Sequence, residues 1–254
     1  MSCIQKILES NCQNFTIDIF VVDGGSSDGT VLAIIEKYPS INIEVCNGLF
    51  WNRGMIAAWE NACATGISYD GFLLLNDDVS IHKEALNELV QIVSKWEGKK
   101  IAVGFTVSPS TGNVSYGGLK RRTRFSRLGF ELTKDNRDEI LTMNGNCVLV
   151  PSMVYAKIGM LNPRFQHSFG DIDYGLRVTK VGLGIELTKN PVANLEVNDA
   201  LYSSSRKMGL REIYSLVNDP KGLPINEWFY FTRTHAGPLW LLNFGIRYLK
   251  MLTR

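Results

Sequence analysis

Two apolar runs that each end in acidic residues constrain the fold of this chain more than any other feature. Residues 17–22 read IDIFVV and lead directly into Asp23, and residues 71–75 read GFLLL and lead into NDD. Short apolar runs bounded by turn-forming residues are typical of strands buried on both faces of a parallel sheet. Ligands of open α/β sheets bind beyond the carboxyl ends of the strands, so both acidic groups lie where a ligand site is expected.

Helical periodicity alternates with these runs along the chain. Strands are predicted at residues 17–22, 41–46, 71–75, 101–107 and 146–150, and helices at residues 1–12, 30–38, 52–64, 83–96 and 154–158 and towards the end of 164–181. This alternation predicts an α/β fold with a mostly parallel sheet and helices on both faces. We expect one domain over residues 1–222, ending in a polar, loop-rich stretch at 200–222. Residues 223–254 are predicted to be an aromatic and basic helical extension.

Composition narrows the class of protein further. The 254 residues suffice to bury the core of one α/β domain. The formal net charge of +2 is too balanced to favour nucleic acid as a partner. Five cysteines without a C-x-x-C pair argue against a zinc cage or a disulfide framework and indicate reduced thiols. The N-terminus lacks a signal-peptide pattern and no apolar run is long enough to span a membrane, so we expect a cytoplasmic protein.

A third acidic pair, Asp171 and Asp173, occurs in a loop that opens a predicted helix. Each acidic group also has a structural alternative. Asp28 suits a cap on the helix that follows it, Asp171 and Asp173 suit the same role on theirs, and adjacent acids after a strand suit a turn. The occurrence of all three groups in one chain favours a functional site.

Three ordered motifs resemble those of glycosyltransferase family 2. FVVDGGSSDGT at residues 20–30 resembles the family's first signature, LLNDD at residues 74–78 its D-x-D segment, and GDIDYGLR at residues 170–177 its acceptor-site segment. The resemblance covers roughly residues 1–190. It implies the nucleotide-diphospho-sugar transferase (GT-A) fold and an inverting, hexosyltransferase-type glycosyltransferase. This chain departs from the family pattern by an amide at Asn76, by Gly170 in place of a Glu, and by apparently lacking the usual first strand.

The resemblance also implies a donor site for a UDP- or dTDP-sugar and a divalent cation, Mn²⁺ or Mg²⁺. Carboxylates suit these hard cations, which act as Lewis acids on a departing diphosphate. Asp78 would ligate the metal, and a C-terminal His or Arg would join the metal shell or close over the diphosphate, His235 being the candidate metal ligand. The implied nucleotide and donor contacts are Asp23, Ser26, Asp28, Asn52, Asp77 and Arg233.

On the acceptor side, Asp171 matches the family's general base, which takes the proton of the attacking hydroxyl. Asp173, Trp51 and Asn144 are the further candidates for acceptor contacts. Each has a structural alternative: an ion pair of Asp173 with Arg177, core packing for Trp51 and a plain turn for Asn144.

The implied acceptor is a glycan or a lipid-linked sugar, as in surface polysaccharide synthesis. The aromatic and basic C-terminal stretch suits peripheral contact with the inner face of the cell membrane, or packing against its own domain. Two other functions remain open: a non-catalytic glycosyltransferase-like scaffold, and a sugar-phosphate nucleotidyltransferase. The loop after residue 22 lacks the basic pair expected of the nucleotidyltransferase. The sequence does not indicate an oligomeric state.

Overall fold

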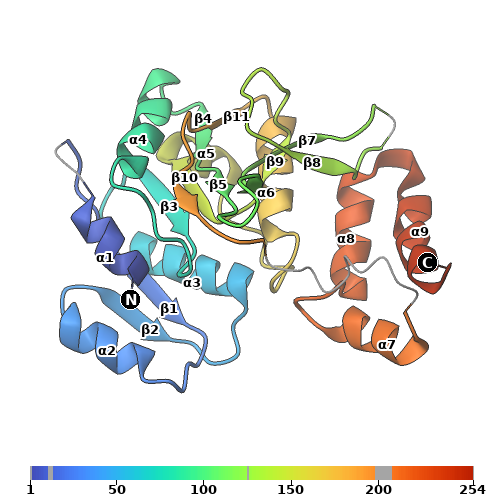
Figure 1. The fold of residues 1–254 in the computed structure, drawn as a ribbon, viewed down its shortest axis with the longest axis horizontal. Helices are drawn as coiled ribbons and strands as arrows, with labels where there is room; N and C mark the ends of the chain where they lie inside the picture. The colour runs from blue at the N-terminus through green and yellow to red at the C-terminus, as the bar shows by residue number, and fades with distance from the viewer. Residues whose placement is uncertain (1, 11–13, 125, 198–207, 254) are drawn as a thin grey trace.

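A computed structural model describes the chain except for residues 1, 11–13, 125, 198–207 and 254. Its central sheet has the strand order β11–β4–β10–β3. These strands span Gly184–Leu187 (β11), Lys100–Val103 (β4), Cys147–Pro151 (β10) and Gly71–Leu75 (β3). β11 is parallel to β4, whereas β10 runs antiparallel to both of its neighbours. The α/β architecture expected from the sequence is therefore confirmed, with β10 as an antiparallel strand inside the sheet (Figure 1).

A separate two-stranded parallel sheet lies beside the central one. It consists of β1 (Phe20–Asp23) and β2 (Asn42–Val45), joined through α2 (Thr30–Lys37). β1 is shorter than predicted, because residues 17–19 lie outside the strand. Within the described residues, β1 pairs with β2 alone and β3 pairs with β10 alone.

Two hydrophobic cores cover the two faces of the central sheet. On one face pack α3 (Trp51–Ala64), α5 (Ser152–Ile158) and α6 (Gly170–Lys180), and on the other α1 (Ser2–Glu9) and α4 (Ala85–Lys95). Alternate residues of a strand face opposite sides, so Ile101 and Val103 of β4 enter the first core while Ala102 enters the second. This alternation explains why the strands are apolar throughout.

Residues 101–107, predicted as one strand, form two strands that separate at Gly104. A Cβ at Gly104 would lie 2.6 Å from Cγ2 of Val192 and 3.1 Å from Sγ of Cys147, so the chain bends where only glycine fits. Small antiparallel pairings then follow in residues predicted to be irregular. The strands involved are β5 (Thr106–Val107), β6 (Val114–Tyr116), β7 (Gly118–Arg121), β8 (Phe130–Thr133), β9 (Thr142–Met143) and β12 (Ala193–Asn194).

The C-terminal part is helical. It contains α7 (Leu210–Asn218), α8 (Ile225–His235), the 3₁₀ turn η1 (Gly237–Leu239) and α9 (Trp240–Thr253). The prediction of a loop across 200–222 was wrong at α7, whose single fully packed residue, Leu216, gives too weak an apolar pattern to recognise. A third hydrophobic cluster joins α7, α8 and α9 to Phe165 and Phe169, so the C-terminal helices share a core with the segment that leads into α6.

No helix in the described part of the chain combines the length and the apolar character needed to cross a membrane. The four described cysteines, Cys3, Cys46, Cys63 and Cys147, are free thiols. Cys12 lies outside the described residues.

Candidate active site

The loop after β1 is built on the carboxylate of Asp23. Oδ1 of Asp23 accepts hydrogen bonds from the backbone N–H of Gly25 (3.0 Å) and of Ser26 (2.7 Å), and Oδ2 accepts one from the Ser26 hydroxyl (2.5 Å). The Ser26 hydroxyl is the main cause of the lowered pKa of Asp23, followed by its backbone N–H. Asp28, also predicted at the donor, accepts from the N–H of Thr30 at the start of α2, which matches the capping alternative.

Trp51 and Asn76 connect the first turn of α3 to the end of β3. The indole Nε1–H of Trp51 donates to Oδ1 of Asn76 over 2.6 Å. A carbonyl oxygen at this position accepts the hydrogen bond without placing a charge beside the ring. This contact gives a physical reason for the amide at the first position of the NDD segment. Because the indole is engaged in this way, Trp51 belongs to the site and is only partly buried.

Asp171 begins α6 and is held at the same place. Oδ2 of Asp171 accepts from the N–H of Gly145 (2.9 Å), and Oδ1 accepts from the N–H of Ile172 (2.7 Å). Burial raises the pKa of Asp171 and these backbone hydrogen bonds oppose the rise. A Cβ at Gly145 would collide with the Trp51 ring and lie 3.1 Å from Cβ of Asp171. Gly145 is thus the contact through which Asp171 and Trp51 are packed together.

Gly145 and Asn76 are site residues that the motifs did not single out for a role. The signal was present at Gly145, which stands between two asparagines directly before a strand. Only the fold shows that its missing side chain makes room for Trp51 and Asp171. The hydrogen bonds and packing therefore bring the ends of β3 and β9, the start of α3 and the start of α6 to one place.

Asp77 and Asp78 follow Asn76 and are exposed. Partial desolvation, and next the negative charge of Asp77, raises the pKa of Asp78. Two adjacent carboxylates of this kind repel each other and gain from a cation between or beside them. Mg²⁺ is commonly held by one or two carboxylates together with substrate phosphates, so Asp77 and Asp78 fit a divalent cation.

His235 does not fit that metal site. Its side chain is 7% exposed, and Nε2 lies 2.8 Å from Oδ1 of Asp173. The other oxygen of Asp173 accepts from Nε of Arg177 at 2.8 Å, and Asp173 is fully buried. The predicted metal ligand and the predicted acceptor contact are therefore corrected: this pair joins α6 to α8, as the ion-pair alternative for Asp173 and Arg177 anticipated. Arg233, one turn of α8 earlier, is exposed.

Asn52 also requires correction. It is fully buried, and its Nδ2 donates to the carbonyl oxygens of Asn162 (3.0 Å) and Phe165 (2.7 Å). A side chain enclosed in this way holds the loop before α6 and is closed to a nucleotide donor. A Cβ at Gly170 would overlap Oδ1 of Asn52, so the glycine that replaces the family's Glu and the buried Asn52 depend on each other. Asn144 pairs with Gly117 through both its backbone N–H and its side-chain oxygen.

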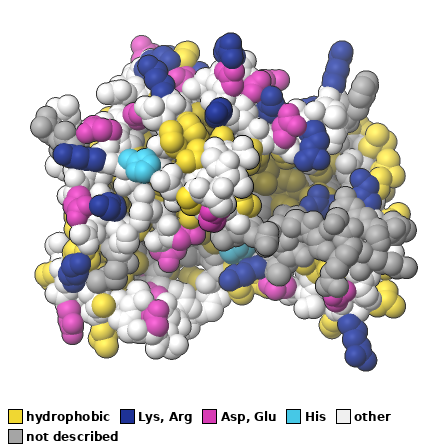
Figure 2. All heavy atoms as spheres, in the orientation of Figure 1, with side chains coloured by type: hydrophobic (Ala, Val, Ile, Leu, Met, Phe, Trp, Pro, Cys, Tyr) yellow, Lys and Arg dark blue, Asp and Glu magenta, His cyan; other side chains and the backbone are white. Residues whose placement is uncertain are grey.

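A cavity of about 1580 Å³ opens at this site and continues between β1 and β3. At its mouth lie Asp23, Ser26, Trp51 and Asp77. Figure 2 shows a hollow in the middle of one face, with acidic side chains gathered beside it and a basic and a histidine side chain on its other side. A mouth with carboxylates, next to a carboxylate of raised pKa, suits a ligand that brings both a cation and an acidic hydroxyl group.

The fold and this acidic mouth define an α/β protein of the nucleotide-diphospho-sugar transferase (GT-A) type. A family model described as glycosyl transferase family 2 matches residues 2–158, which is more than half of the chain. The chain belongs to glycosyl transferase family 2, as the three motifs indicated.

Distant relatives agree with this assignment. The chain is similar to the N-acetylglucosaminyl-diphospho-decaprenol L-rhamnosyltransferases of two Mycobacterium tuberculosis strains, CDC 1551/Oshkosh and ATCC 25618/H37Rv, each 23% identical over 192 residues. The match covers 65% of this chain and 62% of each relative, so the chain spans under two thirds of the length of these curated relatives.

Solved structures of similar shape support the fold. The crystal structure of S. aureus TarS has a TM-score of 0.52 and 11% identity, covering 91% of this chain and 40% of TarS. The structure of TarS residues 1–349 has a TM-score of 0.54 at 11% identity, covering 94% of this chain and 68% of that one. At this identity the likeness concerns the fold alone.

Proposed function

We propose that this protein is an inverting glycosyltransferase that moves a sugar from a nucleoside-diphosphate donor to a hydroxyl group of its acceptor. The observation that carries the proposal is the position of Asp171. Its carboxylate is fixed by the N–H groups of Gly145 and Ile172, and its pKa is raised by burial. A general base works best when its pKa approaches the working pH, so the raised pKa suits proton removal from an acceptor hydroxyl.

Asp171 takes the hydroxyl proton while the hydroxyl oxygen forms its bond to the anomeric carbon and the nucleoside diphosphate leaves with the electrons of the broken bond. A single displacement of this kind inverts the anomeric configuration. Asp23 and Ser26, at the end of β1, hold the nucleoside, and Trp51 presents its ring beside Asp171. Trp51 thus forms a wall between the donor and the acceptor.

Asp78 holds a divalent cation, Mn²⁺ or Mg²⁺, with Asp77 towards the ribose. The cation supplies positive charge to the diphosphate as it leaves. The exposed carboxylates and the raised pKa of Asp78 support this assignment.

The acceptor is a lipid-linked sugar, and the work takes place at the cytoplasmic face of a membrane. The mycobacterial relatives are named for a decaprenol-diphosphate acceptor, which supports this choice. The surface of α9 supports it too: Leu241, Leu242 and Leu249 are between 60% and 63% exposed, and Lys250 lies on the same helix. An amphipathic helix with exposed leucines and basic residues suits the interface of an anionic membrane.

The test is transfer and hydrolysis of UDP- and dTDP-sugars with Mn²⁺ by the parent and by Asp171→Asn. We expect Asp171→Asn to lose about two to four orders of magnitude in turnover with little change in nucleotide binding, because only proton transfer is removed. Glu36→Gln removes a carboxylate from the exposed face of α2 and serves as the matched control with unchanged turnover. Equal turnover of Asp171→Asn and the parent contradicts the assignment of the base.

A non-catalytic scaffold gives a different pattern. Parent protein that binds no nucleotide and turns over no donor, while it remains folded, is the result expected of a scaffold.

A further inference from the structure

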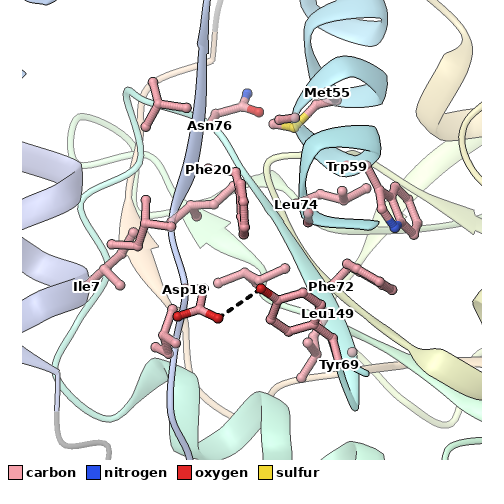
Figure 3. Close-up of a pocket in the computed structure, with 18 of the residues that line it drawn as sticks. Ile7, Asp18, Phe20, Met55, Trp59, Tyr69, Phe72, Leu74, Asn76 and Leu149 are labelled. Atoms are coloured by element: carbon pink, nitrogen blue, oxygen red, sulfur yellow. Dashed lines mark hydrogen bonds between the residues drawn. The ribbon is translucent and has the colours of Figure 1, made fainter. Parts of the chain in front are cut away.

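The large cavity is a slot between two strand edges that face each other. Figure 3 shows β1 on one side and β3 on the other, with the ring of Phe20 between them. At the lower end the slot is closed by a hydrogen bond of 2.8 Å from the Tyr69 hydroxyl to Oδ2 of Asp18. At the upper end it opens at Asn76 and Asp77. Neither strand has a sheet partner on the side of the slot within the described residues.

The hydrogen bonds of the two strands show which backbone groups face the slot. The carbonyls of Ile19 and Asp23 accept from the β2 side, so the alternate residues Phe20 and Val22 direct their N–H and C=O groups into the slot. The N–H of Asn76 donates towards β10, so Leu73 and Leu75 direct their groups into the slot from β3. Open rows of donors and acceptors on both walls form a template for one added strand.

The side chains around the slot set the chemistry of that strand. Apolar residues line both faces, from α3 on one side and from α4 and α1 on the other: Met55, Ala58, Trp59, Ala62, Leu86, Leu89, Val90, Val93 and Ile7. A strand covered on both faces carries apolar side chains at every position. Five residues at about 3.3 Å each, with roughly 4.8 Å between strands and roughly 10 Å between layers, fill about 800 Å³. The cavity of 1580 Å³ accommodates this strand with room left at its mouth.

The start of α1 indicates how the strand enters. The hydroxyl of Ser2 lies 2.8 Å from that of Ser80, and the thiol of Cys3 donates to the carbonyl of Asn76 over 3.4 Å. The first residues of α1 therefore lie at the carboxyl end of β3. A strand parallel to β3 ends at that point, and α1 then provides the crossover to the parallel strand β1.

We propose that the slot between β1 and β3 binds an extended apolar peptide strand of about five residues, parallel to both and joined at its carboxyl end to α1. Its backbone bonds Phe20 and Val22 on one side and Leu73 and Leu75 on the other, which joins the two sheets into one. The proposal is independent of the sugar, the donor and the catalytic role of Asp171.

The experiment adds five valine and isoleucine residues and a short polar turn ahead of Ser2 in the full chain. The matched control has the same length, with proline and aspartate at alternate strand positions. Amide hydrogen exchange is measured for the N–H groups of Phe20, Val22, Leu73 and Leu75. We expect exchange at these amides to slow by at least about tenfold with the apolar segment, together with a higher melting temperature, and no change with the control.

A third arm adds the apolar peptide as a separate molecule. Protection by the tethered segment that the free peptide reproduces only at high concentration supports entry through α1, because tethering raises the effective concentration. Protection by the free peptide alone overturns the connection to α1. Equal exchange in the apolar and proline-containing chains overturns the proposal itself.

Discussion

The substitution Asp173→Asn tests the contact between α6 and α8 most directly. Asp173 is fully buried and accepts from Arg177 Nε with one oxygen, while the other lies 2.8 Å from His235 Nε2. An asparagine keeps the shape of the side chain but replaces one acceptor oxygen with an NH₂ group. Either Arg177 or His235 then faces a donor in place of an acceptor.

The size of the effect follows from these contacts. Loss of one charge-assisted hydrogen bond costs about 1.5–3 kcal/mol, and removing one partner of a buried pair costs about 3–5 kcal/mol. Arg177 keeps its hydrogen bonds to the carbonyls of Ile158 and Met160 and is 26% exposed, so its charge is not left bare. We therefore expect the free energy of unfolding to fall by about 3 kcal/mol, at the lower end of the range for a buried pair.

The assay is urea unfolding followed by circular dichroism, with hydrogen exchange to locate the change. A loss of this size lowers the urea midpoint by about 1 M or more. The exchange of amides in α8 is expected to rise before that of β4, because the substitution loosens the junction of the C-terminal helices. Asp135→Asn is the matched control: it also removes a carboxylate from an Arg pair, but the Asp135 and Arg137 side chains are 39% and 91% exposed. Equal midpoints for the two variants refute the structural role of Asp173.

Four further predictions concern the candidate active site. Gly145→Ala places a methyl group against the Trp51 ring, and we expect a loss of roughly 1–3 kcal/mol in urea unfolding together with slower transfer. Trp51→Phe removes the hydrogen bond to Asn76 and is expected to cost about 1 kcal/mol in the same assay. Asp78→Asn should abolish the Mn²⁺-dependent rise in melting temperature with a nucleoside diphosphate; an undiminished rise contradicts its role as metal ligand. The transfer rate should rise with pH through a carboxyl pKa above the ordinary range, because burial raises the pKa of Asp171.

The ionisation of Asp171 also has a consequence for stability. A carboxyl group whose folded-state pKa is raised favours folding in its protonated form. Its contribution is therefore present below the unfolded-state pKa and is lost as pH rises through the folded-state pKa. In Asp171→Asn this part of the pH dependence of stability disappears, which urea unfolding across the acidic range measures.

The strands show how far local patterns reach. The run at Gly71–Leu75 is a strand with the bounds expected from its sequence, because an apolar run between turn formers has few alternatives. The helices α2, α3 and α4 lie within one or two residues of their predicted bounds, since their apolar spacing is strong. Small strands such as β6 and β9 have no local signal, because two or three residues are set by their partners across the sheet and not by their own pattern.

The site divides in the same way. The sequence by itself determined the α/β class, the family, and the residues that follow strands, Asp23, Asp77 and Asp78, because strand ends are visible as a change from apolar to polar residues. Only the tertiary structure decided which polar residues are closed to a ligand. Asn52 and His235 carry donor groups that suit a nucleotide or a metal, yet packing of the loop before α6 and of α8 buries them against partners far away in the chain. Burial depends on contacts between distant segments, and no short stretch of sequence encodes it.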